Sequence, residues 1–322
     1  MTKYSFYLLL LFFFTACNNE SSKTKEQVKD SVVTDQDSAV VTGEIAPLDM
    51  DSMVSTEPVA ASTGPVTLKF DLPVGKSYSY AATIDMNQEM PGQKIKSTML
   101  YNYTLKVNKG SRGVKEMTST YGDMSMHMEM NGKKMSFGAG QKEEPLNPFS
   151  MIGKMFAAMK GKSFSMEVNE EGDIINVKGF DKIADAVIAE LNIPEASREK
   201  FEESFKSQFN EKSVKQMFSE SFNIFPGKKI SPGDSWQKKA ALPLASQSVD
   251  VNTTYTLKEL RGGNYIIDAS TKYINGGSKP VIGKSRLIVD AKTGLVLQLD
   301  GEQKMEGSNT VISRSRIRSK EI

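Results

Sequence analysis

The stretch M-S-M-H-M-E-M-N-G, residues 124–132, decides the fold class of this chain of 322 residues. Methionines alternate strictly with other residues, as in a strand buried on one face, and the stretch ends on Asn-Gly, the strongest short hairpin signal. Upstream, T-M-L-Y-N-Y-T-L-K-V at 98–107 alternates in the same way and is followed by Asn108-Lys109-Gly110. We expect adjacent antiparallel strands here, with hairpin turns at 108–110 and 131–132.

Similar strand patterns extend from this hairpin in both directions. The expected upstream strands are 66–72 (V-T-L-K-F-D-L), 78–86, 97–107 and 113–120. The expected strands after Trp236 are 246–260, 264–273, 283–290, 296–304 and 309–318. Short strands joined by turns rich in Gly and Asn predict an antiparallel meander rather than a parallel sheet.

The period of the apolar residues changes between residues 149 and 223. Helices are expected at 148–160, 181–191 and 194–209, followed by a shorter one that carries Val214 and Phe218, because apolar residues recur there every three or four positions. Strands are expected at 163–168 and 173–177. The predicted fold is α+β: a β-rich, curved antiparallel sheet, half-barrel-like, with a helical insert at about 149–223 packed on one side or plugging it.

The N-terminus has the layout of a bacterial lipoprotein signal. Lys3 precedes the apolar run 7–16, which is too short to span a membrane, and Cys17 follows the run directly. Cys17 is the only cysteine, and its thiol is predicted to carry a diacylglycerol that holds the protein on the membrane. An ordinary cleaved signal peptide with a chance cysteine is the alternative interpretation.

The chain therefore divides into three expected regions. Residues 1–16 are a signal peptide, and residues 17–65, which are polar and acidic, are a disordered tether. Residues 66–322 are a single β-rich domain. We expect a membrane-anchored lipoprotein of the cell envelope, at the outer membrane, on its periplasmic or surface side.

Composition narrows the possible partners and cofactors. The net charge is only +2, so nucleic acid is not an expected partner. His127 is the only histidine, which leaves no histidine-based zinc site. We expect neither a metal nor a cofactor.

Two methionine patterns form the candidate ligand site. One lies on a single face of the strand at 124–130 and the other on one face of the helix at 148–160, and together they comprise Met124, Met126, Met128, Met130, Met151, Met155 and Met159. Methionine suits adaptable apolar binding, but it also fills cores, and its thioether binds Cu(I). These three interpretations remain open, although His127 should face away from the strand methionines and so weakens a mixed copper site.

Two further segments have structural interpretations. The turn P-G-D-S-W at 232–236 should be held by Asp234, with Trp236 covering the edge of the core. The C-terminal stretch R-S-R-I-R-S-K at 314–320 places its arginines on one strand face. We interpret it as an exposed edge strand protected by charge, with contact to anionic lipid or glycan as the alternative.

The chain also resembles a known family. The segments I-F-P-G-K-K-I-S-P-G-D-S-W (224–236), E-E-G-D-I-I-N-V-K-G-F-D (170–181) and V-D-A-K-T-G-L-V (289–296), behind a lipobox, are similar to a family of exported Bacteroidota lipoproteins of unknown function. The resemblance covers about residues 66–318 and implies an exported β-rich domain, without assigned catalytic residues. At the level of fold alone, the chain is similar to periplasmic lipid-carrier half-barrels.

The expected function follows from the anchor and the methionine patterns. We expect a lipid-anchored, non-enzymatic envelope protein that binds an apolar ligand or an envelope partner. A purely structural or interaction module is one alternative, and a hydrolase that depends on His127 or on a carboxylate pair in a cleft is the other.

Overall fold

The computed structural model describes residues 64–90, 92–138, 150–191, 193–244, 247–274, 282–305 and 310–322. The described residues of Glu57–Leu242 and Ser248–Ile322 belong to one compact unit, to which the following description applies. The expected signal peptide, including the run before Cys17, Cys17 itself and the expected tether up to residue 63 lie outside the described residues. No helix of the described part is both long and apolar enough to cross a membrane.

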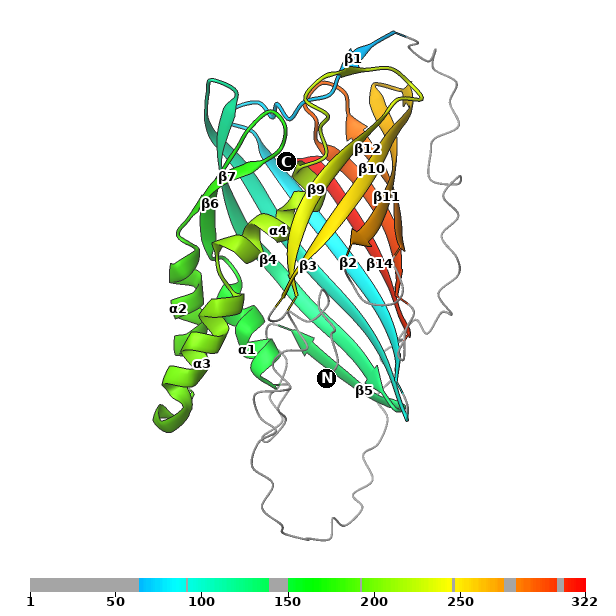
Figure 1. Ribbon diagram of the computed structural model, residues 1–322. Coiled ribbons are helices and arrows are strands. Elements are labelled where there is room, and N and C mark those ends of the chain that lie inside the picture. Colours follow the sequence, from blue (N-terminus) through cyan, green and yellow to red (C-terminus); the bar gives the residue numbers. More distant parts are fainter. Residues whose placement is uncertain are drawn as a thin grey trace. The chain divides into compact units, whose positions relative to one another are not determined.

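Twelve strands form one open, curved antiparallel sheet (Figure 1). Their order is β7-β6-β4-β3-β2-β14-β13-β12-β11-β10-β9, and β5 pairs with β4. The strands are β2 (Ser77–Met90), β3 (Gln93–Ser111), β4 (Val114–Met130), β5 (Lys133–Gly138), β6 (Ser163–Val168), β7 (Ile174–Lys178), β9 (Ser235–Leu244), β10 (Gln247–Arg261), β11 (Asn264–Ile274), β12 (Ile282–Asp290), β13 (Val296–Met305) and β14 (Thr310–Glu321). The predicted fold class is confirmed.

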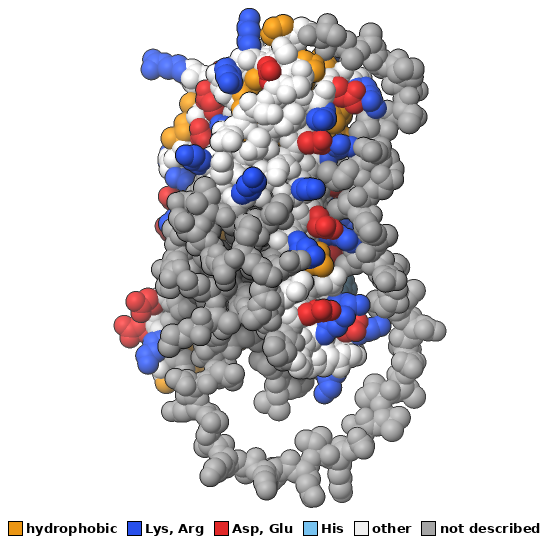
Figure 2. Space-filling model, turned by 45° about the vertical axis from the view of Figure 1, so that its right-hand side comes forward, with side chains coloured by type: hydrophobic (Ala, Val, Ile, Leu, Met, Phe, Trp, Pro, Cys, Tyr) orange, Lys and Arg blue, Asp and Glu red, His pale blue; other side chains and the backbone are white. Residues whose placement is uncertain are grey.

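The position of β14 corrects the expectation of an edge strand. It pairs with β13 on one side and with β2 on the other, so it joins the two ends of the body's sequence. Its arginines form ion pairs with carboxylates of neighbouring strands: Arg314–Glu302 (2.8 Å), Arg316–Asp85 (2.7 Å) and Arg318–Asp300 (3.0 Å). Figure 2 shows acidic and basic side chains beside one another on the surface. Cross-strand pairing, rather than protection of an edge, explains the arginines.

The turn between β3 and β4 lies further along the chain than expected. β3 continues to Ser111, and the turn is formed by Arg112 and Gly113 with φ of 50° and 78°. The register shifts between Val107 and Lys109, so Asn108 lies at a β-bulge, and the expected turn at 108–110 is wrong. The turn at residues 131–132 is confirmed, with φ of 51° and 82°.

The segment before β2 is only partly a strand. Val66–Thr67 (β1) pairs with Lys229–Ile230 (β8), and the expected strand at 66–72 is wrong beyond Thr67. The rest, which we call the bridging segment (residues 68–72), donates backbone hydrogen bonds from Phe70 to Glu170 O and from Asp71 to Thr293 O, both 2.8 Å. These acceptors lie in the β6–β7 and β12–β13 turns, so the segment spans the two halves of the sheet.

The helices are α1 (Ser150–Met159), α2 (Phe180–Glu190), α3 (Glu195–Gln208) and α4 (Glu211–Phe222). α1 packs against β4, β5 and α2, whereas α4 lies within the curve of the sheet (Figure 1). We call the face of the sheet toward α4 the inner face and the opposite one the outer face. The expectation that the helical insert plugs one side is therefore confirmed by α4.

Aromatic rings fix α4 on the inner face. Phe218 meets Tyr103 of β3 edge-on at 5.1 Å, and Phe222 meets Tyr80 of β2 edge-on at 6.4 Å. Phe222 also contacts Phe70 of the bridging segment at 5.2 Å. Burial raises the pKa of the Tyr80 and Tyr103 hydroxyls above the usual value of 10.0, so both stay neutral in the core.

We expect Phe218→Ala to lower the free energy of unfolding by about 3–5 kcal/mol, because the side chain is 2% exposed and its loss leaves a cavity. Urea unfolding of the purified chain measures the change. The control Val74→Ala, at a residue 52% exposed, should change it by less than about 0.5 kcal/mol. Equal effects of the two substitutions would show that α4 does not hold the core.

The bridging segment gives a pH-dependent prediction. Lys115 Nζ lies 2.8 Å from Asp71 Oδ1, and this hydrogen bond lowers the pKa of Asp71 below its usual 3.8. A lowered carboxyl pKa adds stability above the unfolded-state pKa, and that stability is lost as the pH falls through the folded-state pKa. Because Asp71 is partly exposed, Asp71→Asn should cost at most about 1 kcal/mol at neutral pH. The difference from wild type should shrink as the pH falls below 3.8; a difference independent of pH would contradict this.

Candidate functional site

The strand methionines of the predicted ligand site lie in the interior. Met124, Met126 and Met128 are 5, 4 and 5% exposed and face inward from β4. Met130, at the end of β4, is half-buried, and its Sδ accepts a hydrogen bond from Gln93 Nε2 at 3.3 Å. Their burial favours the core-packing interpretation, while ligand binding by these residues stays a prediction.

The helix methionines lie on an element that packs against the strand of the other methionines. Met155 and Met159 of α1 are 7 and 5% exposed, and Met151 is half-buried. Because α1 packs against β4 and β5, the two methionine patterns lie on elements that contact each other.

His127 lies exposed on the outer face, away from the methionines. Its Nδ1 is 2.8 Å from Ser136 Oγ of β5, and Thr98 lies opposite it on β3. Asp85, on the next strand, accepts hydrogen bonds from Thr98 and Arg316, both at 2.7 Å. Within the described ranges, no group of three or more His, Cys, Asp or Glu side chains is placed to hold a metal ion. Polar pairing across the outer face accounts for this row of residues.

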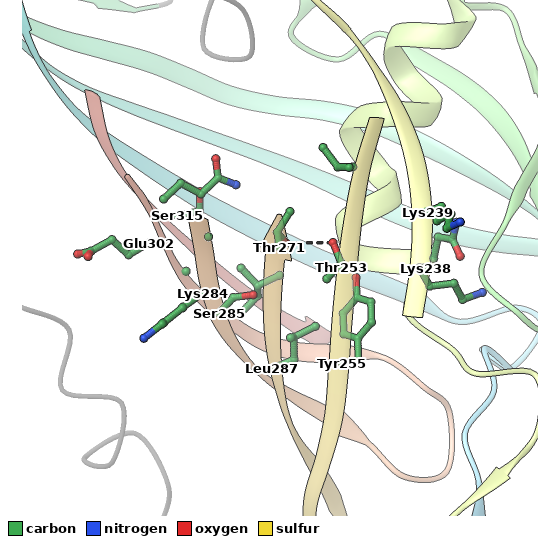
Figure 3. A pocket seen from close by; sticks show the side chains of 16 residues that line it. Lys238, Lys239, Thr253, Tyr255, Thr271, Lys284, Ser285, Leu287, Glu302 and Ser315 are labelled. Atoms are coloured by element: carbon green, nitrogen blue, oxygen red, sulfur yellow. Dashed lines mark hydrogen bonds between the residues drawn. The ribbon is translucent and has the colours of Figure 1, made fainter. Parts of the chain in front are cut away.

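A groove opens on the inner face near the C-terminal end of α4. It is lined by residues of β9 to β14 and by Asn223, which follows α4, and its cavity volume is about 80 Å³. Leu287, Leu299 and Tyr255 line its apolar part. Its polar part carries hydroxyls from four strands: Thr253, Thr271, Ser285 and Ser315. Figure 3 shows these hydroxyls between Lys238 and Lys239 on one side and Glu302 and Lys284 on the other.

Glycines on adjacent strands form part of the groove lining. A Cβ atom at Gly283 would lie 3.1 Å from Gln303 Cγ, and one at Gly301 would lie 3.2 Å from Ser285 Cβ. Side chains of neighbouring strands already approach both positions closely, so a larger residue at either glycine would crowd them, and the two glycines expose the backbone to the groove.

Hydrogen bonds and ring packing position the groove side chains. Thr253 Oγ1 and Thr271 Oγ1 are 3.0 Å apart, a hydroxyl pair drawn as a dashed line in Figure 3. Tyr255 stacks on Trp236 of β9, with ring centroids 5.6 Å apart and an interplanar angle of 18°. The Trp236 Nε1–H donates to Ile224 O at 2.8 Å, which ties β9 to the end of α4. Asn223 Oδ1 is buried and has no hydrogen-bond partner among the residues that the structure describes.

The groove residues were not predicted from the sequence. Serine, threonine and glycine within strands usually mark exposed faces or bulges, so they gave no ligand signal. A usable signal is the change in residue type along one face of a strand, from large and apolar to small or polar. It is seen in Ile267, Ala269 and Thr271 of β11 and in Leu287, Ser285 and Gly283 of β12. Each strand passes from apolar to small or polar on the side that should be buried.

These features define a class of protein: an open antiparallel half-barrel that holds a helix in its curve and leaves a small groove beside that helix. The chain belongs to the family of unknown function DUF6263, whose family model matches residues 112–307. That match runs from the turn before β4 to just beyond β13, so it includes all the described helices and most of the groove strands. A comparison with curated proteins finds no match.

We expect the double variant Met126→Leu/Met128→Leu to retain the fold. Leucine conserves most of the buried volume, so each substitution should cost less than about 1.5 kcal/mol. If these side chains only pack the core, a Cu(I) titration should give the same affinity for the variant and the wild type. A loss of Cu(I) affinity on the order of tenfold would instead establish a thioether site.

Proposed function

We propose that this chain is a lipid-anchored protein of the bacterial cell envelope that binds a ligand in the groove, without catalysing a reaction. The observation that carries the proposal is a contrast across the inner face. Over β2 to β4 this face is filled by tyrosines, methionines and the phenylalanines of α4. Over β10 to β14, hydroxyls and glycines leave it open.

The size of the groove limits what it holds. Pockets that enclose a whole small molecule have volumes of about 300–1,000 Å³, and this cavity measures about 80 Å³. The groove therefore holds one end of a ligand, and the remainder lies across its open mouth. Leu287, Leu299 and Tyr255 provide the apolar contacts.

The absence of catalysis is part of the proposal. His127 and Ser136, the histidine–serine pair that a hydrolase of the serine type would use, are exposed on the outer face, whereas the groove lies on the inner face. A nucleophile and base on one side of a sheet cannot act on a ligand bound on the other side.

The anchor is proposed from the N-terminal sequence. The apolar run 7–16 and Cys17 have the layout of a lipoprotein signal, and the resemblance to exported Bacteroidota lipoproteins agrees with it. The protein would then reside at the outer membrane, on its periplasmic or surface side. The bound partner would be a ligand or a protein close to that membrane.

Radiolabelled palmitate tests the anchor in a bacterial host that processes lipoproteins. The wild-type chain should incorporate label and fractionate with membranes. Cys17→Ala should lose the label, because only the thiol forms the thioether to diacylglycerol. Label that persists in Cys17→Ala would contradict the anchor.

Extraction of co-purified molecules tests the groove. The full chain is purified from envelopes, and its non-covalent lipid-soluble ligands are quantified by mass spectrometry, together with Thr271→Leu and Lys272→Leu. Thr271 lines the groove, and Lys272 is exposed on the opposite face of the same strand, so it is a matched control. Thr271→Leu should lose the ligand because it fills the groove, and Lys272→Leu should keep it. Equal ligand content in all three proteins, or none in the wild type, would contradict the proposal.

A further inference from the structure

We infer that the groove recognises the uncharged, hydroxyl-bearing end of its ligand, a polyol such as a sugar ring or a glycerol group. This inference rests on the proposed function and specifies the chemistry of the ligand. It starts from the polar atoms of the groove, which neighbouring strands present together on one face.

The hydroxyl side chains match a polyol in hydrogen-bonding capacity. Thr253, Thr271, Ser285 and Ser315 come from β10, β11, β12 and β14, and each hydroxyl both donates and accepts. A polyol also donates and accepts at every oxygen. An ionised carboxylate or a phosphate dianion only accepts, so it would use only half of this capacity.

Asn223 is the groove residue that distinguishes most sharply between ligands that can donate a hydrogen bond and ligands that cannot. Its Oδ1 is a buried acceptor that no side chain or backbone group of the described part of the chain satisfies, and its side chain lines the groove. A buried acceptor without a donor is costly, and a ligand that brings a donor removes this cost. A hydroxyl can donate to Asn223 Oδ1, whereas a carboxylate cannot.

The apolar part of the groove fits the same ligand class. Sugar rings and glycerol carry C–H groups beside their hydroxyls, and these can lie against Leu287, Leu299 and Tyr255. Because Tyr255 is stacked on Trp236, its ring is held in place before a ligand arrives. A cavity of about 80 Å³ suits one such small group rather than a long chain.

Charged side chains lie at the periphery. Figure 3 shows Lys284 and Glu302 extending away from the hydroxyls on one side. Lys238 and Lys239 lie on the opposite side of the hydroxyls. Glu302 pairs with Arg314 at 2.8 Å. The lysines would favour an anionic ligand end, so the decisive comparison is between a polyol and a carboxylate that share the same alkyl tail.

The lipid-anchored full chain in phosphatidylcholine vesicles is titrated with hexyl β-D-glucoside and, separately, with hexanoate. The single tryptophan, Trp236, reports binding by its fluorescence, since it stacks on a groove residue. We expect the glucoside to bind about tenfold more tightly than hexanoate, the difference that one satisfied buried acceptor provides.

Variants at Asn223 assign the effect to its acceptor. Asn223→Leu should weaken glucoside binding about tenfold and leave hexanoate binding unchanged. Asn223→Asp keeps acceptor oxygens at the same place, so it should retain glucoside binding and weaken hexanoate by charge repulsion. Thr253→Val, which removes one hydroxyl at nearly constant shape, should also weaken the glucoside selectively and serves as a second variant if Asn223→Leu does not fold.

Hexanoate binding that equals or exceeds glucoside binding would overturn the inference, and so would glucoside binding that Asn223→Leu leaves intact. Failure of both probes to bind would also overturn it. None of these results touches the proposed function, which stands or falls with the ligand extracted from wild type, Thr271→Leu and Lys272→Leu.

Discussion

The packing of α4 against the inner face of the open sheet is the contact on which the rest of the structure depends. An open sheet cannot bury its own inner face, so the rings of Phe218 and Phe222 take the place of a second sheet against Tyr103 and Tyr80. The hydrogen bond from Trp236 Nε1–H to Ile224 O then attaches the edge strand β9 to the end of this helix. The groove lies beside the end of α4 because the aromatic filling ends there.

Two turns of the sheet pack their backbone directly against the end of α4 and the bridging segment. A Cβ atom at Gly172 would lie 1.6 Å from Phe222 O, and one at Gly294 would lie 2.2 Å from Lys69 O, so both sites exclude any side chain. Both glycines also have positive φ, of 79° and 72°. The bridging segment (68–72) joins turns from the two halves through the Gly294–Lys69 contact and its backbone hydrogen bonds to Glu170 O and Thr293 O.

The candidate site shows how far sequence reasoning reaches. The alternation around Met126 and the helical spacing of Met155 predicted which side chains face the interior, because burial follows the period of each element. The same reasoning missed Asn223 and the hydroxyl floor around Thr271. That groove exists only where neighbouring strands in register each present a small or polar residue, which no single strand reveals.

The sequence by itself determined the order of the elements, most of their bounds and the turn at residues 131–132, because these follow from local periodicity and from the φ that Asn-Gly adopts readily. The tertiary structure alone decided that β14 lies beside β2, a pairing that brings Arg316 to Asp85 across 231 residues of sequence. It also places Asn108 at a β-bulge instead of in a turn. The bridging segment, which the sequence predicts as a strand, instead hydrogen-bonds to two turns of the sheet. Each of these outcomes depends on partners distant in the chain, and local patterns carry no information about distant partners.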